Sequence, residues 1–307
     1  MQNVHRGHFL QQRCRIDLAA KLCRCVKWQR IVVAAAISAF ASMNMSGCTV
    51  PLAPITGVVW QPDSATLQPR GNWQLFGAHE LLVQWTSVDG IAFVQDPEVT
   101  SVDKVPDWQR IAGEPWARDV ILGLAGRFDE TAARNDIANL AKASERLAKL
   151  PTPLHVVGWY FPVEIDPTWQ EAAQIVPLLE KLPRPLWISV YDRGNIGPKA
   201  LADNLAKWLP ADIGIFFQDG VGVYAREAYV AASYIDALSA RFGRQRVRVI
   251  AEAFRPKVGE GFRSATLAEL QPQLSAYRGY EIYLFDGPHY MSDALTNQLA
   301  VGRSSDR

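Results

Sequence analysis

Cysteine and histidine are both scarce in this chain, and neither is placed to build a site. All four cysteines lie at or before Cys48, so the residues after it have no thiol pair that could form a disulfide. Three histidines follow Cys48, namely His79, His155 and His289, and none is paired at the spacing of metal ligands. The sequence therefore predicts neither a disulfide framework nor a metal site, and a hydrophobic core has to supply the stability.

Several motifs that identify enzyme classes are also absent. The chain has no Gly-x-Gly-x-x-Gly turn and no phosphate-binding loop, and it lacks the Gly-x-Ser-x-Gly elbow of many acyl hydrolases. Residues 1–47 hold seven of the 32 lysines and arginines but one of the 31 acidic residues. The remainder has 25 basic and 30 acidic residues, a net charge of −5, so we expect no cofactor and no nucleic-acid partner.

The N-terminal segment has the order of features that marks an exported protein. Lys27 and Arg30 precede an uncharged, mostly apolar run at residues 31–41, which is too short to span a bilayer as a helix. Met-Ser-Gly-Cys48 follows, and small residues before a cysteine resemble the lipobox of bacterial lipoproteins. The resemblance implies that residues 1–47 are a signal segment and that Cys48 receives diacylglycerol and an acyl chain. A buried helix with an isolated cysteine is the alternative.

Two details extend this N-terminal prediction. Residues 1–25 make an unusually long basic leader, so Val26 is a candidate for the true start of the protein. Thr49, and not Asp, follows the cysteine. By resemblance to the sorting signals of enteric bacteria, this implies an anchor at the periplasmic face of the outer membrane. Residues 48–55 then form a tether, and the lipid is the only membrane attachment that we expect.

Short apolar runs alternate with helical patterns through the rest of the chain. The runs lie at residues 57–60, 81–85, 119–125, 154–160, 186–191, 213–217, 247–251 and 281–285. Helices are expected at 73–80, 107–112, 129–149, 166–182, 198–209, 225–242 and 266–276. Near-continuous apolar runs are typical of parallel strands that are buried on both faces. The pattern predicts an α/β fold, a single (β/α)8 barrel over residues 56–302; an open doubly wound sheet is the alternative.

Polar and aromatic residues follow the ends of these predicted strands, where barrel enzymes carry their active sites. The candidates for binding a substrate are Gln61, Trp85, Arg127, Tyr160, Tyr191, Gln218, Asp219 and Asp286. Aromatic faces pack against the C–H faces of sugars, while a few polar groups fix the orientation of a ligand. Core packing is the alternative role for the aromatic residues, and a simple turn is the alternative for the glycines after Asp219. Asp219 itself could instead orient a neighbouring acid.

Glu164 and Glu252 are the candidates for catalysis. They follow the fourth and seventh predicted strands, and in this they resemble the acid/base and the nucleophile of many retaining glycosidases. Glycoside hydrolysis needs one carboxyl group that carries a proton and another that is ionised. Structural roles stay open: Glu164 precedes a predicted helix start and could pair with Arg127, while Glu252 could pair with Arg255. Val163 also stands where those glycosidases usually have asparagine.

Five phrases at the strand ends resemble a family of bacterial barrels known as domain of unknown function 4434. They are Gly57-Val-Val-Trp-Gln-Pro62, Gln84-Trp-Thr86, Gly158-Trp-Tyr-Phe-Pro-Val-Glu-Ile-Asp166, Gln218-Asp-Gly-Val-Gly222 and Glu252-Ala-Phe254. They occur in order over almost the whole predicted barrel. The family is regarded as glycoside-hydrolase-like, so the resemblance implies the barrel fold and a carbohydrate substrate, without a settled reaction.

The leading hypothesis is a retaining glycosidase that acts on a cell-envelope or secreted polysaccharide through Glu164 and Glu252. The alternative, from another functional class, is a non-catalytic carbohydrate-binding lipoprotein that assists polysaccharide export or anchoring. Both share the barrel and its aromatic residues, so the separation of the two carboxyl groups, and then activity on glycans, distinguish them. A purely structural envelope protein is a third alternative.

The lipobox-like sequence generates a first test. Cys48→Ala removes the sulfur that would carry the lipid, so we expect this variant to accumulate as an unlipidated precursor. Mass spectrometry of the mature amino terminus makes the measurement. Cys25→Ala, which lies before the proposed cleavage point, is the control and should be processed normally. An unmodified amino terminus elsewhere in the wild-type protein would refute the prediction.

Overall fold

The computed structural model describes residues 53–304. The predicted signal segment, Cys48 and most of the predicted tether lie outside the described residues. Between residues 53 and 304, no helix is both long enough and apolar enough to cross a membrane. The first strand begins at Ile55, whose side chain is buried together with that of Ala53. The folded domain therefore starts slightly before the predicted boundary at residue 56.

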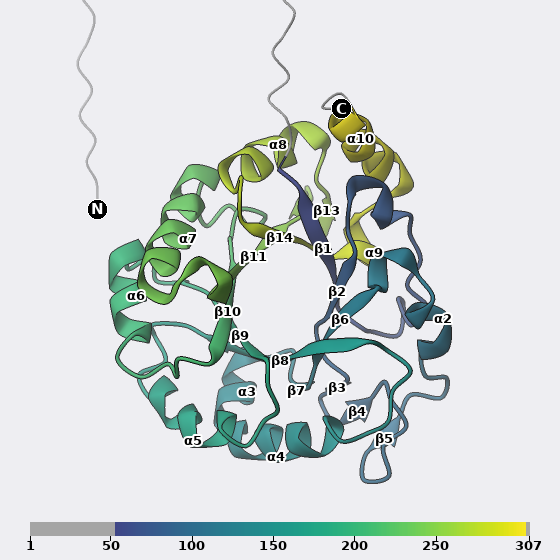
Figure 1. The fold of residues 1–307 in the computed structure, drawn as a ribbon, viewed down its shortest axis with the longest axis vertical. Coiled ribbons are helices and arrows are strands. Elements are labelled where there is room, and N and C mark those ends of the chain that lie inside the picture. The colour runs from purple at the N-terminus through teal and green to yellow at the C-terminus, as the bar shows by residue number, and fades with distance from the viewer. Residues whose placement is uncertain (1–52, 305–307) are drawn as a thin grey trace, which may run out of the picture. The chain divides into compact units, whose positions relative to one another are not determined.

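Eight parallel strands close into a barrel, as predicted (Figure 1). In chain order they are β1 (Ile55–Trp60), β2 (Glu80–Val83), β6 (Asp119–Gly123), β8 (Val156–Ile165), β9 (Leu186–Val190), β10 (Ile213–Gln218), β11 (Val247–Glu252) and β14 (Glu281–Phe285). Each strand pairs with the next one in this order, and β14 pairs with β1 to complete the ring. The closed ring excludes the open doubly wound sheet, and the fold is a (β/α)8 barrel.

One side chain from each barrel strand fills the inside of the barrel. These side chains are Val59, Leu82, Ile121, Tyr160, Trp187, Phe216, Ile250 and Tyr283, which form one buried cluster. Phe216 meets Tyr160 and Tyr283 edge-on, with ring centroids 5.6 and 5.0 Å apart. A larger set of apolar side chains packs between the outside of the barrel and the helices. The barrel interior is therefore a packed core, and any site has to lie at one of its ends.

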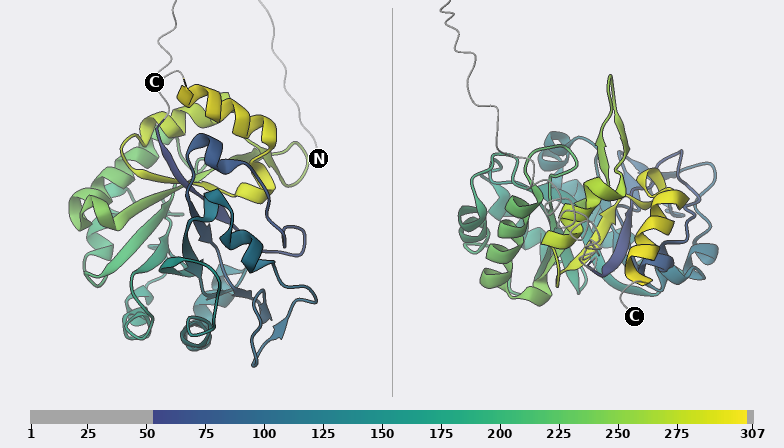
Figure 2. Two further views of the ribbon diagram at one scale, coloured as in Figure 1. Left: turned by 45° about the vertical axis from the view of Figure 1, so that its right-hand side comes forward. Right: turned by 90° about the horizontal axis from the view of Figure 1, so that it is seen from above.

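Helices cover the outside of the barrel (Figures 1 and 2). The α-helices are α2 (Trp108–Ala112), α3 (Glu130–Asn135), α4 (Ile137–Leu147), α5 (Val176–Leu179), α6 (Pro198–Leu205), α7 (Ala228–Phe242), α8 (Leu267–Ala276), α9 (Gly287–Tyr290) and α10 (Asp293–Ser304). Single 3-10 turns are η1 (Trp73–Phe76), η2 (Pro115–Ala117), η3 (Ala172–Ile175) and η4 (Arg244–Arg246). Helices α2, α6, α7 and α8 lie within the predicted ranges, whereas the sequence patterns do not predict α9 and α10.

The predicted helix at residues 129–149 is divided into α3 and α4. The backbone leaves the helical conformation at Asp136, where φ is −108° and ψ is 16°. Asp129 caps α3 by accepting a hydrogen bond from the Ala132 N–H at 2.7 Å. The Asp136 carboxylate accepts a hydrogen bond from Arg127, outside the helix. Because of this break, α3 packs on its own against β8, next to the C-terminal end of the strand.

The predicted helix at residues 166–182 is wrong over most of its length. The buried Asp166 carboxylate accepts hydrogen bonds from the Thr168 N–H at 2.8 Å and from the Arg193 N–H at 2.7 Å. The second bond ties the loop after β8 to the loop after β9. Helical structure begins only at η3, and α5 is a single turn with proline near its start. A loop therefore lies beside the end of β8 where a helix was expected.

Two small sheets follow the C-terminal ends of barrel strands. β3 (Ser87–Val88), β4 (Ile91–Ala92), β5 (Thr100–Ser101) and β7 (Ala125–Gly126) form a sheet in the order β5-β4-β3-β7. β12 (Phe254–Pro256) and β13 (Phe262–Ser264) form an antiparallel hairpin directly after β11. This yellow-green hairpin projects from the barrel in the right-hand view of Figure 2. Strands this short carry no apolar periodicity, so the sequence does not predict them.

A cluster of charged side chains around Arg248 closes the other end of the barrel. The Arg248 guanidinium lies 4.2 Å from the centre of the Trp187 ring, donates to Tyr283 Oη at 2.7 Å and pairs with Glu80 at 3.2 Å. It also forms an ion pair with Glu281. Glu80 and Glu281 are the first residues of β2 and β14. The cluster therefore joins three strands at their N-terminal ends.

Removal of Arg248 should destabilise the barrel. We expect Arg248→Ala to lower the free energy of unfolding by roughly 2–4 kcal/mol, because the mostly buried Glu80 carboxylate loses its partner. Urea denaturation followed by tryptophan fluorescence gives the value. Arg118→Ala is the matched control: Arg118 pairs with Asp119 at the surface and should contribute less than about 1 kcal/mol. Equal losses in the two variants would contradict the role of Arg248.

Candidate functional site

Glu164 lies within β8 and not in a loop after it, because the strand continues past it. A bulge between Phe161 and Glu164 brings Glu164 into register with Ser189 of β9. The side chain is nearly buried at the C-terminal end of the strand. One carboxylate oxygen accepts a hydrogen bond from Gln218 Nε2 at 3.1 Å, and the other lies 3.9 Å from the Arg134 guanidinium. The carboxyl group therefore has one amide donor and one cation as neighbours.

A second carboxyl group, which the sequence patterns do not single out, lies against Glu164. Glu130, the first residue of α3, accepts a hydrogen bond from the Glu164 N–H at 3.0 Å. Burial raises the pKa of Glu164 to about 7, and the Glu130 carboxylate adds to the rise, while Arg134 and Arg193 oppose it. Burial also raises the pKa of Glu130. Glu164 therefore holds a proton at mildly acidic pH.

Gln218 and Tyr160 lie at different depths, although the sequence predicts substrate contact for both. Gln218 Nε2 donates to Ser189 Oγ at 2.7 Å as well as to Glu164, so it holds the carboxyl group in place. Tyr160 is fully buried and packs against Phe216 in the barrel interior. The prediction for Tyr160 is wrong because β8 extends well past it, which leaves the ring in the layer below the barrel mouth.

Glu252 is the last residue of β11 and is also nearly buried. The loop after β10 covers it. The Val223 N–H donates to Glu252 Oε2 at 3.2 Å, and a Cβ added at Gly222 would lie 2.6 Å from the Glu252 Cβ. Burial raises the pKa of Glu252 to about 8, and the Asp219 carboxylate contributes to the rise. Glu252 therefore holds a proton at neutral pH in the free protein.

The predicted role of Asp219 as a sugar-binding residue is wrong. Its side chain is fully buried, and protein groups already occupy both of its oxygens. One oxygen accepts hydrogen bonds from the N–H groups of Val221 and Glu252, each at 3.2 Å. The other accepts from Gln273 Nε2 at 2.7 Å and from Tyr277 Oη at 2.9 Å. Asp219 therefore holds the backbone at Glu252 and joins β10 and β11 to α8.

Tyr191 follows β9 and lies within the electrostatic range of both candidate catalytic residues. Burial raises the pKa of its hydroxyl group. The Arg226 guanidinium, 5.0 Å from the centre of the ring, lowers that pKa, while the carboxylates of Glu252 and Glu164 raise it. Among the predicted substrate-binding residues, Tyr191 is thus close enough to both carboxyl groups to interact electrostatically with each.

Arg127 and Trp85 make internal contacts and present little open binding surface. The Arg127 guanidinium pairs with Asp136 and lies 3.6 Å from Asp89. Trp85 is 4% exposed, and its Nε1 donates to a backbone carbonyl of the loop after β1 at 2.9 Å. Its ring meets Phe128 edge-on at 4.9 Å, and Phe128 is 56% exposed. The exposed aromatic surface here therefore belongs to Phe128, which the sequence reasoning missed.

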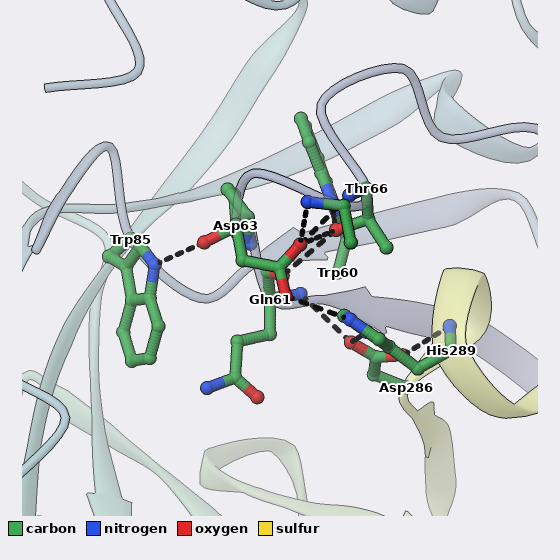
Figure 3. A network of polar contacts seen from close by, with 9 residues as sticks. Trp60, Gln61, Asp63, Thr66, Trp85, Asp286 and His289 are labelled. Carbon is green, nitrogen blue, oxygen red and sulfur yellow. Dashed lines mark hydrogen bonds and ion pairs between the residues drawn. The ribbon is translucent and has the colours of Figure 1, made fainter. Parts of the chain in front are cut away.

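Asp286 and Gln61 belong to a network between the loops after β14 and β1 (Figure 3). The buried Asp286 carboxylate accepts a hydrogen bond from the Gln61 N–H at 3.2 Å and lies 2.7 Å from His289 Nδ1. His289 Nε2 lies 3.1 Å from Asp63. The hydrogen bond with Asp286 raises the pKa of His289 to about 9, and Asp63 adds to the rise. Asp286 is therefore a structural residue and not the predicted ligand of a substrate. The Gln61 side chain points away from the network (Figure 3).

Aromatic side chains gather where the β12–β13 hairpin leaves β11. The Phe254 ring lies 4.7 Å from that of Phe262 and 5.1 Å from that of Tyr290. Phe262 is 47% exposed, and Tyr224, in the loop that covers Glu252, is 64% exposed. These two side chains present apolar faces on the loops that flank Glu252. Of this group, the sequence patterns indicate only Phe254.

The structure thus gathers Glu164, Gln218, Tyr191 and Glu252 at the C-terminal ends of neighbouring barrel strands. Two carboxyl groups, an amide and a phenol are the functional groups that they offer. Over the part of the chain that the structure describes, no three His, Cys, Asp or Glu side chains are grouped as ligands of a metal ion. The arrangement suits proton transfer and hydrogen bonding to a polar ligand.

The four donors around Asp219 generate a prediction. Asp219→Asn replaces one of the two oxygens by an NH2 group, and each oxygen now accepts from two donors, so in either orientation we expect the free energy of unfolding to fall by roughly 1–3 kcal/mol. Urea denaturation measures the loss. Asp293→Asn, at an exposed position in the first turn of α10, is the control and should stay within about 0.5 kcal/mol of the wild type. Unchanged stability together with lost carbohydrate binding would restore the sugar-contact role.

No family model and no curated protein matches the chain. Among solved structures, the barrel is similar to a crystal structure from Bacteroides thetaiotaomicron described as a provisionally assigned alpha-L-fucosidase. The TM-score is 0.58 and the sequence identity is 16%, over 83% of this chain and 94% of that chain. At this level of identity the likeness concerns the fold alone, and this chain shares its barrel fold with that protein.

Proposed function

We propose that this protein is a glycoside hydrolase in which Glu164 and Glu252 act together on a cell-envelope or secreted polysaccharide. The observation that carries the proposal is a pair of nearly buried carboxyl groups with raised pKa values at the ends of β8 and β11. Only β9 and β10 separate these strands in the ring, so both residues belong to the same mouth. A lipid at Cys48, also a proposal, would hold the enzyme at the periplasmic face of the outer membrane.

The surroundings of the two carboxyl groups support different roles for them. Cleavage of a glycosidic bond needs a proton for the leaving oxygen and a negative charge near the sugar carbon. Glu252 suits the proton donor, because its pKa is raised to about 8 by burial and by Asp219. Glu164, with a pKa of about 7, ionises first, since the cations Arg134 and Arg193 oppose the rise that burial and Glu130 cause.

We therefore assign the proton to Glu252 and the negative charge to Glu164. These roles are the reverse of those that resemblance to retaining glycosidases gives to the two strand ends. In the retaining reaction that we propose, Glu252 protonates the leaving oxygen while Glu164 bonds to the sugar carbon. Glu252 then takes a proton from water, whose oxygen displaces Glu164 and frees the sugar.

A non-catalytic carbohydrate-binding lipoprotein is the second candidate. The observation in its favour is the low exposure of Glu164 and Glu252, at 8% and 7%, with Gly222 and Val223 placed over Glu252. A glycosidic oxygen would reach Glu252 only after this loop moves. A binding protein needs no such motion, because exposed aromatic rings such as those of Phe128 and Tyr224 can contact a sugar while the two carboxyl groups stay buried.

The assigned roles predict a narrow pH profile. Activity needs Glu164 ionised and Glu252 protonated, so kcat/KM should rise as pH increases through about 7 and fall as pH increases through about 8. Screening of the mature protein against envelope polysaccharides identifies the substrate for this measurement. Activity that is constant from pH 5 to pH 9 would contradict the prediction.

Two glutamine variants in the same assay separate the roles. Glu164→Gln should lower hydrolysis roughly 1,000-fold for every substrate. Glu252→Gln should spare the kcat/KM of aryl glycosides, whose leaving groups need little protonation, but should lower their kcat because no base then activates the water. Glu227→Gln, exposed at the start of α7, is the control and should keep full activity. The opposite pattern would restore the roles given by resemblance. Glycan binding by the wild type without cleavage of any substrate would favour the binding protein.

A further inference from the structure

A hollow of about 360 Å³ lies beside Glu164, between α3 and the loop that follows β8. One wall contains Thr131, Arg134 and Asn135, and the other contains Thr168, Trp169 and Gln174. Both walls follow the C-terminal ends of barrel strands, so the hollow lies on the same side of the barrel as the candidate site. Its volume is within the range of small-molecule sites, roughly 300–1,000 Å³.

The lining of the hollow is polar, with one broad aromatic surface. Asn135 and Gln174 supply amide groups, and Thr131 and Thr168 supply hydroxyl groups, all of which both donate and accept hydrogen bonds. The partly exposed Trp169 adds an aromatic ring to the lining, with the Arg134 guanidinium over it at 5.5 Å from the ring centre. This combination matches a sugar ring, which carries hydroxyl groups at its edge and C–H groups on its faces.

The charge and the apolar content of the hollow argue against other occupants. The hollow is lined by one anion, Glu171, and one cation, Arg134, and the Arg134 guanidinium already faces the Glu164 carboxylate at 3.9 Å. The lining therefore has no unpaired excess of positive charge to hold an anionic ligand. The aliphatic lining consists of Ile137 and Ile175, of which Ile175 is fully buried. This surface is too small for an apolar ligand. A neutral ligand rich in hydroxyl groups fits the hollow best.

Arg134 connects the hollow to Glu164. Its guanidinium lies 5.5 Å from the centre of the Trp169 ring and donates to the Glu164 backbone carbonyl at 3.1 Å. The same group lies 3.9 Å from the Glu164 carboxylate. A sugar bound in the hollow beside Trp169 would therefore lie close to Arg134, which also contacts Glu164. Two neighbouring sugars of one glycan chain could occupy the hollow and the candidate site in this way.

We infer that this hollow is a subsite for a second, neutral sugar residue of the glycan on which Glu164 and Glu252 act. The inference rests on the proposed function and adds the substrate class. The substrate is a neutral oligosaccharide or polysaccharide that the protein binds over at least two residues. Chain length should therefore increase the affinity, and a polyuronate should bind poorly.

Calorimetric binding of defined oligosaccharides tests the subsite independently of catalysis. The probes are mono- to hexasaccharides of β-1,4-glucan, β-1,3-glucan and β-1,6-linked N-acetylglucosamine, with a galacturonate hexamer as the anionic probe. The variant Asn135→Ala/Gln174→Ala removes two exposed amides from the hollow. The matched control Asn297→Ala/Gln298→Ala removes two exposed amides from α10. Hydrolysis of the same probes by the wild type is measured in parallel.

We expect the hollow variant to bind the preferred hexasaccharide about tenfold more weakly, as the loss of two hydrogen bonds implies. The monosaccharide affinity and the control variant should not change. Equal hexasaccharide affinities in the two double variants, tighter binding of the galacturonate hexamer, or no binding of any neutral probe would overturn the subsite. Weakened binding in the hollow variant without hydrolysis by the wild type keeps the subsite and refutes the hydrolase. Hydrolysis by the wild type, together with unchanged affinity in the hollow variant, refutes the subsite and keeps the hydrolase.

Discussion

A barrel of eight strands is stable only if the side chains that point inward fill it. Here each strand contributes one residue, and the Phe216 ring packs edge-on against Tyr160 and Tyr283. This layer excludes water from below the mouth, so carboxyl groups at the ends of the strands lose much of their hydration. Burial is the largest cause of the raised pKa at both Glu164 and Glu252. The acid–base properties of the candidate site therefore depend on the apolar packing beneath it.

Each candidate catalytic residue has a second carboxyl group as its neighbour, Glu130 beside Glu164 and Asp219 beside Glu252. In both pairs, burial and the neighbouring carboxylate oppose ionisation. The mouth consequently carries less negative charge at neutral pH than four carboxyl groups suggest. A less negative mouth suits a neutral ligand made of hydroxyl groups better than it suits a cation.

The barrel could be predicted from the sequence because a parallel strand that is buried on both faces has to be apolar throughout its length. Position near the C-terminal ends of those strands was also enough to place Glu164 and Glu252 at the mouth. The partners of the other residues could not be predicted in this way. The donors to Asp219 come from as far as 58 positions along the chain, and no local pattern encodes them. The role of Arg134 could not be predicted for a similar reason. Arg134 lies in the short helix α3, which ends at Asp136, whereas the apolar periodicity of the sequence indicates one continuous helix.

The network of Asp63, His289 and Asp286 lies where the first and last strands of the barrel meet. Gln61 and Asp286 are 225 positions apart, so this contact joins the two ends of the barrel sequence and closes a very long stretch of chain. The pKa of His289 is raised from 6.5 to about 9. The stabilisation is therefore complete below pH 6.5 and is lost as pH rises through about 9. A single proton on His289 thus stabilises the contact between the loops after β1 and β14, and alkaline solution should weaken that contact.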